Sequence, residues 1–145
     1  MAVTVDWYDR FPEFYGDNSI DMDDDTFKAE LYNSTHSFTG GDTQRSDILA
    51  NALATNFGYT NPGQDLTSLT WTTTSAIQTW DAADIVWTAA GGSIGPARHA
   101  IFYSDTSTND LLACDVDFGG DQTAGDATDF KITIHSSGIF TGSFV

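Results

Sequence analysis

Aspartate dominates the charged residues of this chain and limits what the chain can fold into. Of its 21 acidic residues 19 are Asp, and only 5 residues are Lys or Arg, so the formal net charge is −16. Asp disfavours helix interiors and prefers turns and helix caps. Threonine, the commonest residue with 20 copies, suits a pleated and half-buried surface. The composition therefore predicts a β protein with many loops that contain Asp, Gly and Ser.

The length of 145 residues predicts one domain, residues 1–145, with a core of its own. A hydrophobic share of 40% argues against intrinsic disorder despite the charge. The single cysteine, Cys114, excludes an intrachain disulfide, and we expect it to be a buried small hydrophobe. The sequence shows neither the long apolar run of a membrane helix nor the pattern of a signal peptide.

Short segments in which apolar and polar residues alternate fill most of the chain, and turn residues separate them. In residues 27–33 one side carries Phe27, Ala29 and Leu31, and the other carries Lys28, Glu30 and Tyr32. Further strands are predicted near 18–21, 66–73, 76–81, 84–89, 97–104, 111–118, 129–135 and 138–144. This pattern predicts an all-β fold, an antiparallel β-sandwich or flattened barrel of jelly-roll-like form, with one or two short helices. We expect these side chains to be mostly buried: Leu31, Trp87, Ile101, Phe102, Val116, Ile132 and Ile134.

Two helices and one tight turn are predicted outside the strands. Residues 42–54 have helical apolar spacing, and Ser46 is positioned to cap the helix. Residues 8–15 predict a short helix that ends at Gly16, with Pro12 in its first turn. Residues 61–64, Asn-Pro-Gly-Gln, predict a type II turn.

The N-terminal segment, residues 1–25, is a candidate interaction element because it is rich in aromatic residues. Aromatic and arginine side chains are enriched in interface hot spots. Two interpretations stay open: the aromatic residues either cover one end of the sandwich, which is slightly favoured, or form a docking arm. The candidate interface residues are Trp7, Tyr8, Arg10, Phe11, Phe14 and Tyr15.

Motifs for catalysis or metal binding are weak. Residues 91–95 match the G-x-S-x-G nucleophile elbow, but Pro96 and a β-like run follow where that motif needs a helix. The Asp-rich stretches 21–25 and 115–129 lack EF-hand spacing, so solvated loops are favoured over one structural Ca²⁺. We expect His36, His99 and His135 to be surface or edge-strand residues. The sequence thus predicts no cofactor, no metal site and no enzymatic activity.

The charge also restricts the partners of the chain. Five scattered basic residues are too few to neutralise a row of phosphates. We therefore expect neither nucleic acid nor an anionic membrane to bind. An acidic surface keeps a protein soluble at high copy number and limits nonspecific adhesion.

Three segments, 18–32, 81–98 and 129–135 with 138–141, together resemble small virion structural proteins of tailed bacteriophages. Linking pieces such as 58–60 and 115–119 keep the same order, so the resemblance spans nearly the whole chain. It implies a capsid decoration, or cement, protein: a homotrimer bound to the major capsid protein on the capsid exterior. Such a protein stabilises the shell because it binds the assembled capsid and not the free subunits. No functional residues carry over from the resemblance.

An alternative is a tail-associated module, or a receptor- or carbohydrate-binding β module, of a phage. Trp71, Trp80 and Trp87 are the side chains that could stack on sugars. Trp87, however, alternates with Ile85 and Ala89 in the manner of a core residue.

Overall fold

A five-stranded antiparallel sheet stands at the centre of the chain. The computed structural model, which describes residues 2–143, gives this sheet the strand order β1-β8-β7-β2-β3. The long strands β7 and β8 pair along most of their length, and β2 pairs with β7 over residues 27–32. The bounds are β1 Thr4–Trp7, β2 Phe27–Tyr32, β3 Gln64–Asp65, β7 Ile94–Ser104 and β8 Leu112–Ala124.

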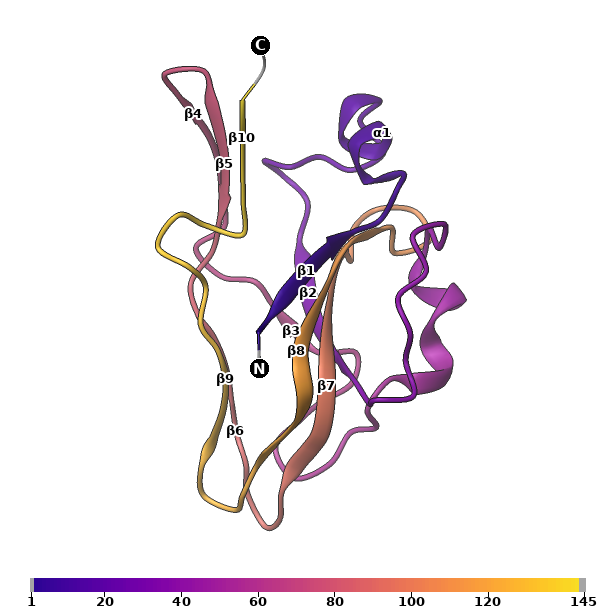
Figure 1. Cartoon of the computed structure of the whole chain (residues 1–145), viewed down its shortest axis with the longest axis vertical. Helices are drawn as coiled ribbons and strands as arrows, with labels where there is room; N and C mark the ends of the chain where they lie inside the picture. Colours follow the sequence, from indigo (N-terminus) through magenta and orange to yellow (C-terminus); the bar gives the residue numbers. More distant parts are fainter. Residues whose placement is uncertain (1, 144–145) are drawn as a thin grey trace.

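Two smaller antiparallel sheets lie against one face of the central sheet, on the left in Figure 1. One pairs β6 (Ile85–Thr88) with β9 (Asp129–Ile132). The other has the order β10-β5-β4, with β4 Thr70–Thr74, β5 Ile77–Asp81 and β10 Phe140–Ser143. The main core fills the space between these layers and includes Trp80, Trp87, Phe102 and Cys114. The predicted all-β sandwich is confirmed, and so is the burial of Cys114.

A long connection between β2 and β3, residues 33–63, covers the other face of the central sheet (Figure 1). We call this connection the covering loop. It contains two 3-10 helices, η1 (Arg45–Asp47) and η2 (Leu49–Asn51). Beneath the covering loop lies a second apolar cluster, formed by Tyr8, Tyr32, Ile48, Ile101, Tyr103 and Leu112.

The prediction of a helix over residues 42–54 is wrong. Isolated β-bridges join Gln44 to Leu111 and Ala52 to Tyr32, and such pairing requires extended backbone at both ends of the segment. Between these bridges only single 3-10 turns form, and Leu49 remains 42% exposed. The N-terminal cap also differs from the prediction: Gln44 and Asp47 cap η1, and Ser46 does not. Long-range contacts therefore override the local helical pattern.

The short N-terminal helix is confirmed as α1, Phe11–Gly16, with Pro12 in its first turn. It begins later than predicted, because β1 occupies the chain up to Trp7. The predicted strand at 18–21 is wrong, since the chain bends back and the Ile20 N–H donates to the Phe14 carbonyl at 3.0 Å. None of the helices among the described residues is long and apolar enough to cross a membrane.

The turn before β3 begins one residue earlier than predicted. The Gly63 N–H donates to the Thr60 carbonyl at 2.7 Å, and the Asn61–Pro62 peptide is cis. The hydrogen bond that closes the turn therefore spans residues 60–63 and not the predicted 61–64. Gly63 has a φ of 99°, in the left-handed region that favours glycine.

The remaining strand predictions agree with the structure in order and approximate position. Six of the seven side chains expected in the core are buried, and the seventh, Ile134, is half-buried. The reason is that β9 ends at Ile132, so residues 133–135 do not continue the strand. Residue 144 of the predicted strand 138–144 lies outside the described residues.

Candidate functional site

The aromatic residues of the N-terminal segment pack mainly against the chain itself. Tyr8, Phe11 and Phe14 are buried, while Trp7 and Tyr15 are half-buried. Phe11 stacks on Trp7 with ring centroids 5.2 Å apart and lies 6.1 Å from Trp80. These contacts match the interpretation that the aromatic residues cover one end of the sandwich. A role of the segment in contacts with another chain stays a prediction.

Arg10, the remaining candidate interface residue, is exposed at the start of α1. Its guanidinium forms a salt bridge with Glu13 at 2.7 Å and lies over the Phe14 ring. The charge of Arg10 is thus compensated by the nearby Glu13 carboxylate.

The tryptophans proposed as sugar-stacking faces lie mostly inside the molecule. Trp80 and Trp87 are buried at 0% and 5% exposure. Trp71 is half-buried, and its ring lies parallel to that of Phe140 and near Tyr15. Two of the three rings therefore present no face to a sugar in this structure.

The other sequence motifs occupy separate places. Ser93 is exposed, and strand β7 begins at Ile94, where a nucleophile elbow would need a helix. In the first acidic stretch, the backbone N–H groups of Asp23 and Asp24 donate to Oδ1 of Asp21. In the second, three of the carboxylates have separate partners: Arg98 for Asp117, the Gly91 N–H for Asp126 and Thr88 for Asp129.

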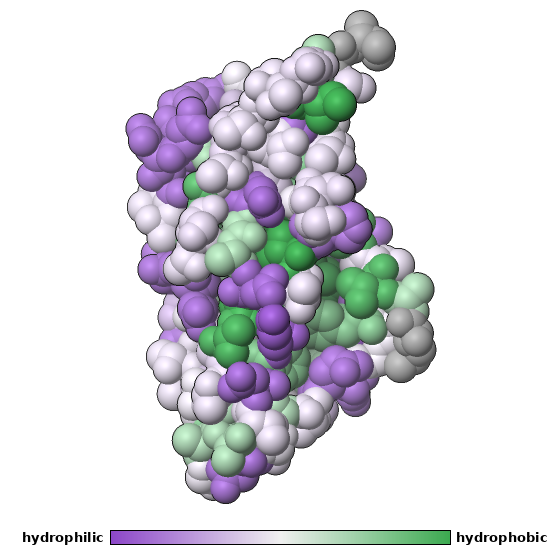
Figure 2. Space-filling view, turned by 90° about the vertical axis from the view of Figure 1, so that its left-hand side faces the viewer, coloured by the Kyte–Doolittle hydropathy of each residue, from purple (hydrophilic) through white to green (hydrophobic). Residues whose placement is uncertain are grey.

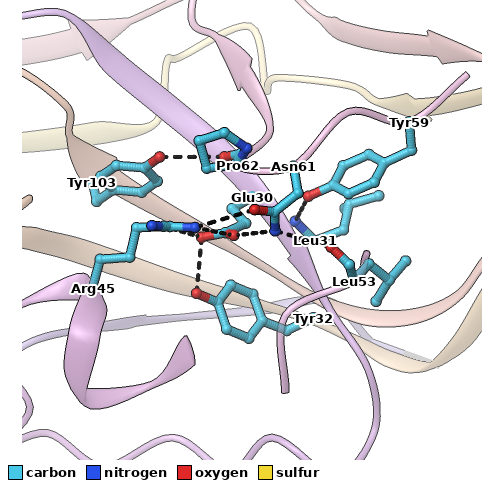
Figure 3. Close-up of polar contacts among 9 residues, drawn as sticks. All are labelled: Glu30, Leu31, Tyr32, Arg45, Leu53, Tyr59, Asn61, Pro62 and Tyr103. Atoms are coloured by element: carbon cyan, nitrogen blue, oxygen red, sulfur yellow. Dashed lines mark hydrogen bonds and ion pairs between the residues drawn. The ribbon is translucent and has the colours of Figure 1, made fainter. Parts of the chain in front are cut away.

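A cluster of polar groups centred on Glu30 fastens the covering loop to β2 (Figure 3). Glu30 is fully buried, and its Oε2 accepts hydrogen bonds from Arg45 Nε at 2.7 Å and from the Tyr32 hydroxyl at 2.9 Å. Its Oε1 accepts from Arg45 Nη2 and from Asn61 Nδ2, each at 2.8 Å. The hydrogen bonds with Glu30 raise the pKa of Arg45. Both carboxylate oxygens are occupied, so the cluster holds the loop in place.

The expectation that all three histidines lie at the surface or on edge strands is wrong for two of them. His36 of the covering loop and His99 of the central strand β7 are buried, and both contact the buried Asp115 of β8. Burial alone would raise the pKa of Asp115, but the hydrogen bonds with the two imidazoles outweigh it and lower this pKa. His135 is exposed, as expected.

An apolar groove opens beside β1, at the edge of the main core. It has a volume of about 570 Å³ and lies between the central sheet and the chain that leads from β9 to β10. A second hollow of about 470 Å³ continues it along β8 and β9. Figure 2 shows hydrophobic residues exposed among polar ones on the face formed by the smaller sheets. The apolar groove is lined by Val3, Val5, Val116, Phe118, Ile132, Ile134 and Ile139, among others.

The apolar groove borders an open strand edge. Strand β1 pairs with β8, and the described residues provide no strand on its other side. Val3 and Val5 are 59% and 43% exposed, although Val5 lies opposite the core residue Val116. The sequence analysis missed β1. The alternation of Val3, Val5 and Trp7 with polar residues is the signal that could have identified it.

The chain was compared with protein-family models, with curated proteins and with solved structures, and none of these comparisons found a match.

Proposed function

We propose that the chain is a virion structural protein that decorates the outer surface of an assembled phage capsid and stabilises it. In this proposal it acts as a homotrimer and docks on the major capsid protein through the apolar groove. The role requires no catalysis. The observation that supports it best is the exposure of Val3 and Val5 on the edge strand β1, next to the apolar groove.

The groove has the features of a site for strand addition. An extended segment can pair with the free edge of β1 through main-chain hydrogen bonds while its alternate side chains enter the groove. The walls offer Val5 and Phe118 on one side and Ile134 and Ile139 on the other. Burial of apolar surface here supplies the association energy that a polar surface does not.

The charge of the chain determines which partner suits the groove. With a net charge of −16, two copies repel each other wherever their surfaces face without compensation. All five basic side chains are already paired with carboxylates of the same chain. We therefore assign the groove to an extended apolar arm of the capsid protein, flanked by neutral or basic residues, and not to a second copy.

An addition experiment tests this proposal. The purified chain is mixed with capsids that lack it, made from the major capsid protein of the particle to which it belongs. Bound chain is measured by co-sedimentation and located by cryo-electron microscopy. We expect density on the capsid exterior, with an additional strand beside β1.

Two matched variants separate docking from general effects of charge. Val5→Asp places a carboxylate in the groove and should abolish co-sedimentation. Ile77→Asp places the same charge on β5, at a side chain that is 48% exposed and outside the groove, and should bind as the wild type does. Undiminished binding of a folded Val5→Asp variant would overturn the assignment of the groove. Binding to tails or glycans, and not to capsids, would favour the alternative module.

A further inference from the structure

His36, His99 and Asp115 bring two imidazole nitrogens and a carboxylate together beneath the covering loop. Nε2 of His36 lies 3.0 Å from Oδ2 of Asp115, and Nδ1 of His99 lies 2.9 Å from Oδ1. All three residues are buried, and one donor atom from each lies within 4.8 Å of the others. We call these three residues the His-Asp cluster. Its members come from the loop, β7 and β8, so the fold itself assembles it.

The central sheet explains why two of these side chains meet. Asp115 of β8 lies opposite Ile101 of β7, and His99 is two residues from Ile101 along the same strand. Residues two apart on a strand point to the same face. His99 and Asp115 are therefore diagonal neighbours on the loop-covered face, while Cys114 points into the main core.

The donor atoms of the His-Asp cluster match those that zinc prefers. Zinc binds imidazole nitrogen and carboxylate oxygen at about 2.0–2.2 Å, so neighbouring ligand atoms of a tetrahedral site are about 3.3 Å apart. His36 Nε2 lies 3.0 Å from Oδ2 of Asp115 and His99 Nδ1 lies 2.9 Å from Oδ1. One ligand atom from each residue lies within 4.8 Å of the others, so the three side chains need only small shifts to close around an ion. Ca²⁺ and Mg²⁺ prefer oxygen ligands, so an imidazole pair favours a transition metal.

The surroundings of the cluster favour a cation. Each of the five Lys and Arg side chains pairs with a carboxylate other than Asp115. Asp42 of the covering loop lies near enough to His36 for their charges to interact. A divalent ion would therefore meet negative charge and no competing ammonium or guanidinium group.

The hydroxyl of Tyr8 is an independent indication of a missing ligand. Tyr8 is only 1% exposed, and its hydroxyl has no hydrogen-bond partner among residues 2–143. Burial raises the pKa of this phenol, and the negative charges of Asp115 and Asp42 add to the effect. Tyr8 belongs to the second apolar cluster beneath the covering loop, so its side chain lies on the side of the sheet that carries the His-Asp cluster. A buried hydroxyl without a partner indicates a bound water or ion.

We propose that His36, His99 and Asp115 bind one Zn²⁺ ion, and that a water molecule near the Tyr8 hydroxyl is the fourth ligand. Each imidazole presents an unprotonated ring nitrogen to the metal in place of its hydrogen bond with Asp115. The ion then fastens His36, and with it the covering loop, to β7 and β8. This proposal is independent of the proposed capsid role.

Metal binding to the wild-type chain provides the first test. The full chain is stripped with EDTA, dialysed and titrated with ZnCl₂ in a calorimeter, and its thermal unfolding is followed with ZnCl₂ or CaCl₂. We expect one zinc per chain and a Tm increase of about 5–10 °C at a free zinc concentration of about 100 times Kd. Calcium should leave the Tm unchanged, and Co²⁺ should give the visible absorption of a tetrahedral site. Absence of zinc uptake would overturn the proposal.

Three glutamine variants locate the site. His36→Gln and His99→Gln each keep a group that can donate to Asp115, but they remove a ligand nitrogen, so zinc affinity should fall by at least about tenfold. His135→Gln changes an exposed histidine outside the cluster and should bind zinc as the wild type does. Unchanged affinity in both folded cluster variants would overturn the proposal. The wild-type zinc and cobalt measurements remain decisive even if a variant fails to fold.

Discussion

The guanidinium of Arg45 donates two hydrogen bonds to the carboxylate of Glu30: Nε donates to Oε2 at 2.7 Å and Nη2 donates to Oε1 at 2.8 Å. Glu30 lies on β2 and Arg45 in η1, so this ion pair joins the covering loop to the sheet. Removal of one partner leaves the other as an uncompensated buried charge. We predict that Arg45→Ala lowers the free energy of unfolding by about 3–5 kcal/mol, as measured by urea denaturation.

The control for this prediction is Arg98→Ala. Arg98 contacts Asp117 with the same two-pronged geometry, at 3.0 and 3.1 Å, but the two side chains are 39% and 23% exposed. Water screens a pair that is partly exposed, so we expect a much smaller loss of stability than for Arg45→Ala. A double variant, Glu30→Gln with Arg45→Met, should be more stable than Arg45→Ala alone. Equal losses for Arg45→Ala and Arg98→Ala would contradict the argument.

Gly63 is a position where only glycine fits. Its φ of 99° is rarely adopted by other residues, and a Cβ there would overlap the Ala29 carbonyl oxygen. We predict that Gly63→Ala lowers the free energy of unfolding by at least about 2 kcal/mol in urea. Gly41→Ala is the matched control, because a Cβ at Gly41 would meet no atom within 4 Å. Similar stabilities of the two variants would contradict this account.

The aromatic contacts of α1 predict a structural role for Phe11. Phe11 is 4% exposed and packs between Trp7 and Trp80. Phe11→Ala should lower the free energy of unfolding by about 3–5 kcal/mol, whereas Phe57→Ala, at a side chain 41% exposed, should change it much less. Deletion of residues 1–15 should unfold or aggregate the chain. A truncated chain that keeps the wild-type Tm would show that the segment is dispensable for folding.

The net charge predicts how the chain behaves toward DNA and toward itself. With all five basic groups paired and a charge of −16, we expect no mobility shift of DNA at physiological salt. Association between copies should increase with added salt, because screening shortens the repulsion to about 8 Å at 0.15 M. Sedimentation velocity at several salt concentrations measures this. Trimers that dissociate as salt is raised would show that ion pairs, and not repulsion, dominate.

The strands were predictable where the alternation of apolar and polar residues alone decides the local structure. Residues 27–32 alternate and form β2, and Trp87 is buried as its alternation with Ile85 and Ala89 indicated. The side of β2 that carries Glu30 and Tyr32 is also buried, which alternation alone does not reveal. The reason is that the covering loop, which follows β2 in the chain, folds back over that face, and the alternation within β2 does not show this.

The polar clusters and the groove were not predictable in the same way. His36, His99 and Asp115 are far apart in the sequence, so their meeting depends on strand pairing and on the path of the covering loop. Arg45 was predicted to lie in a helix because residues 42–54 have helical apolar spacing, and its contact with Glu30 of β2 leaves no local signal. The groove lies beside β1, which pairs with only one strand among residues 2–143, and local alternation does not show whether a strand has one neighbour or two.

The pairing of β1 with β8 also sets the order in which the chain can fold during synthesis. Residues 4–7 pair with residues 114–117, so β1 is translated about 110 residues before its partner strand. Ribosomes add about 5–20 residues per second, so β1 has no strand to pair with for about 5–20 seconds. Throughout that interval Val5 and Trp7 are exposed to other nascent chains and to chaperones. Early capture of this segment by a chaperone would therefore protect the newborn chain from aggregation.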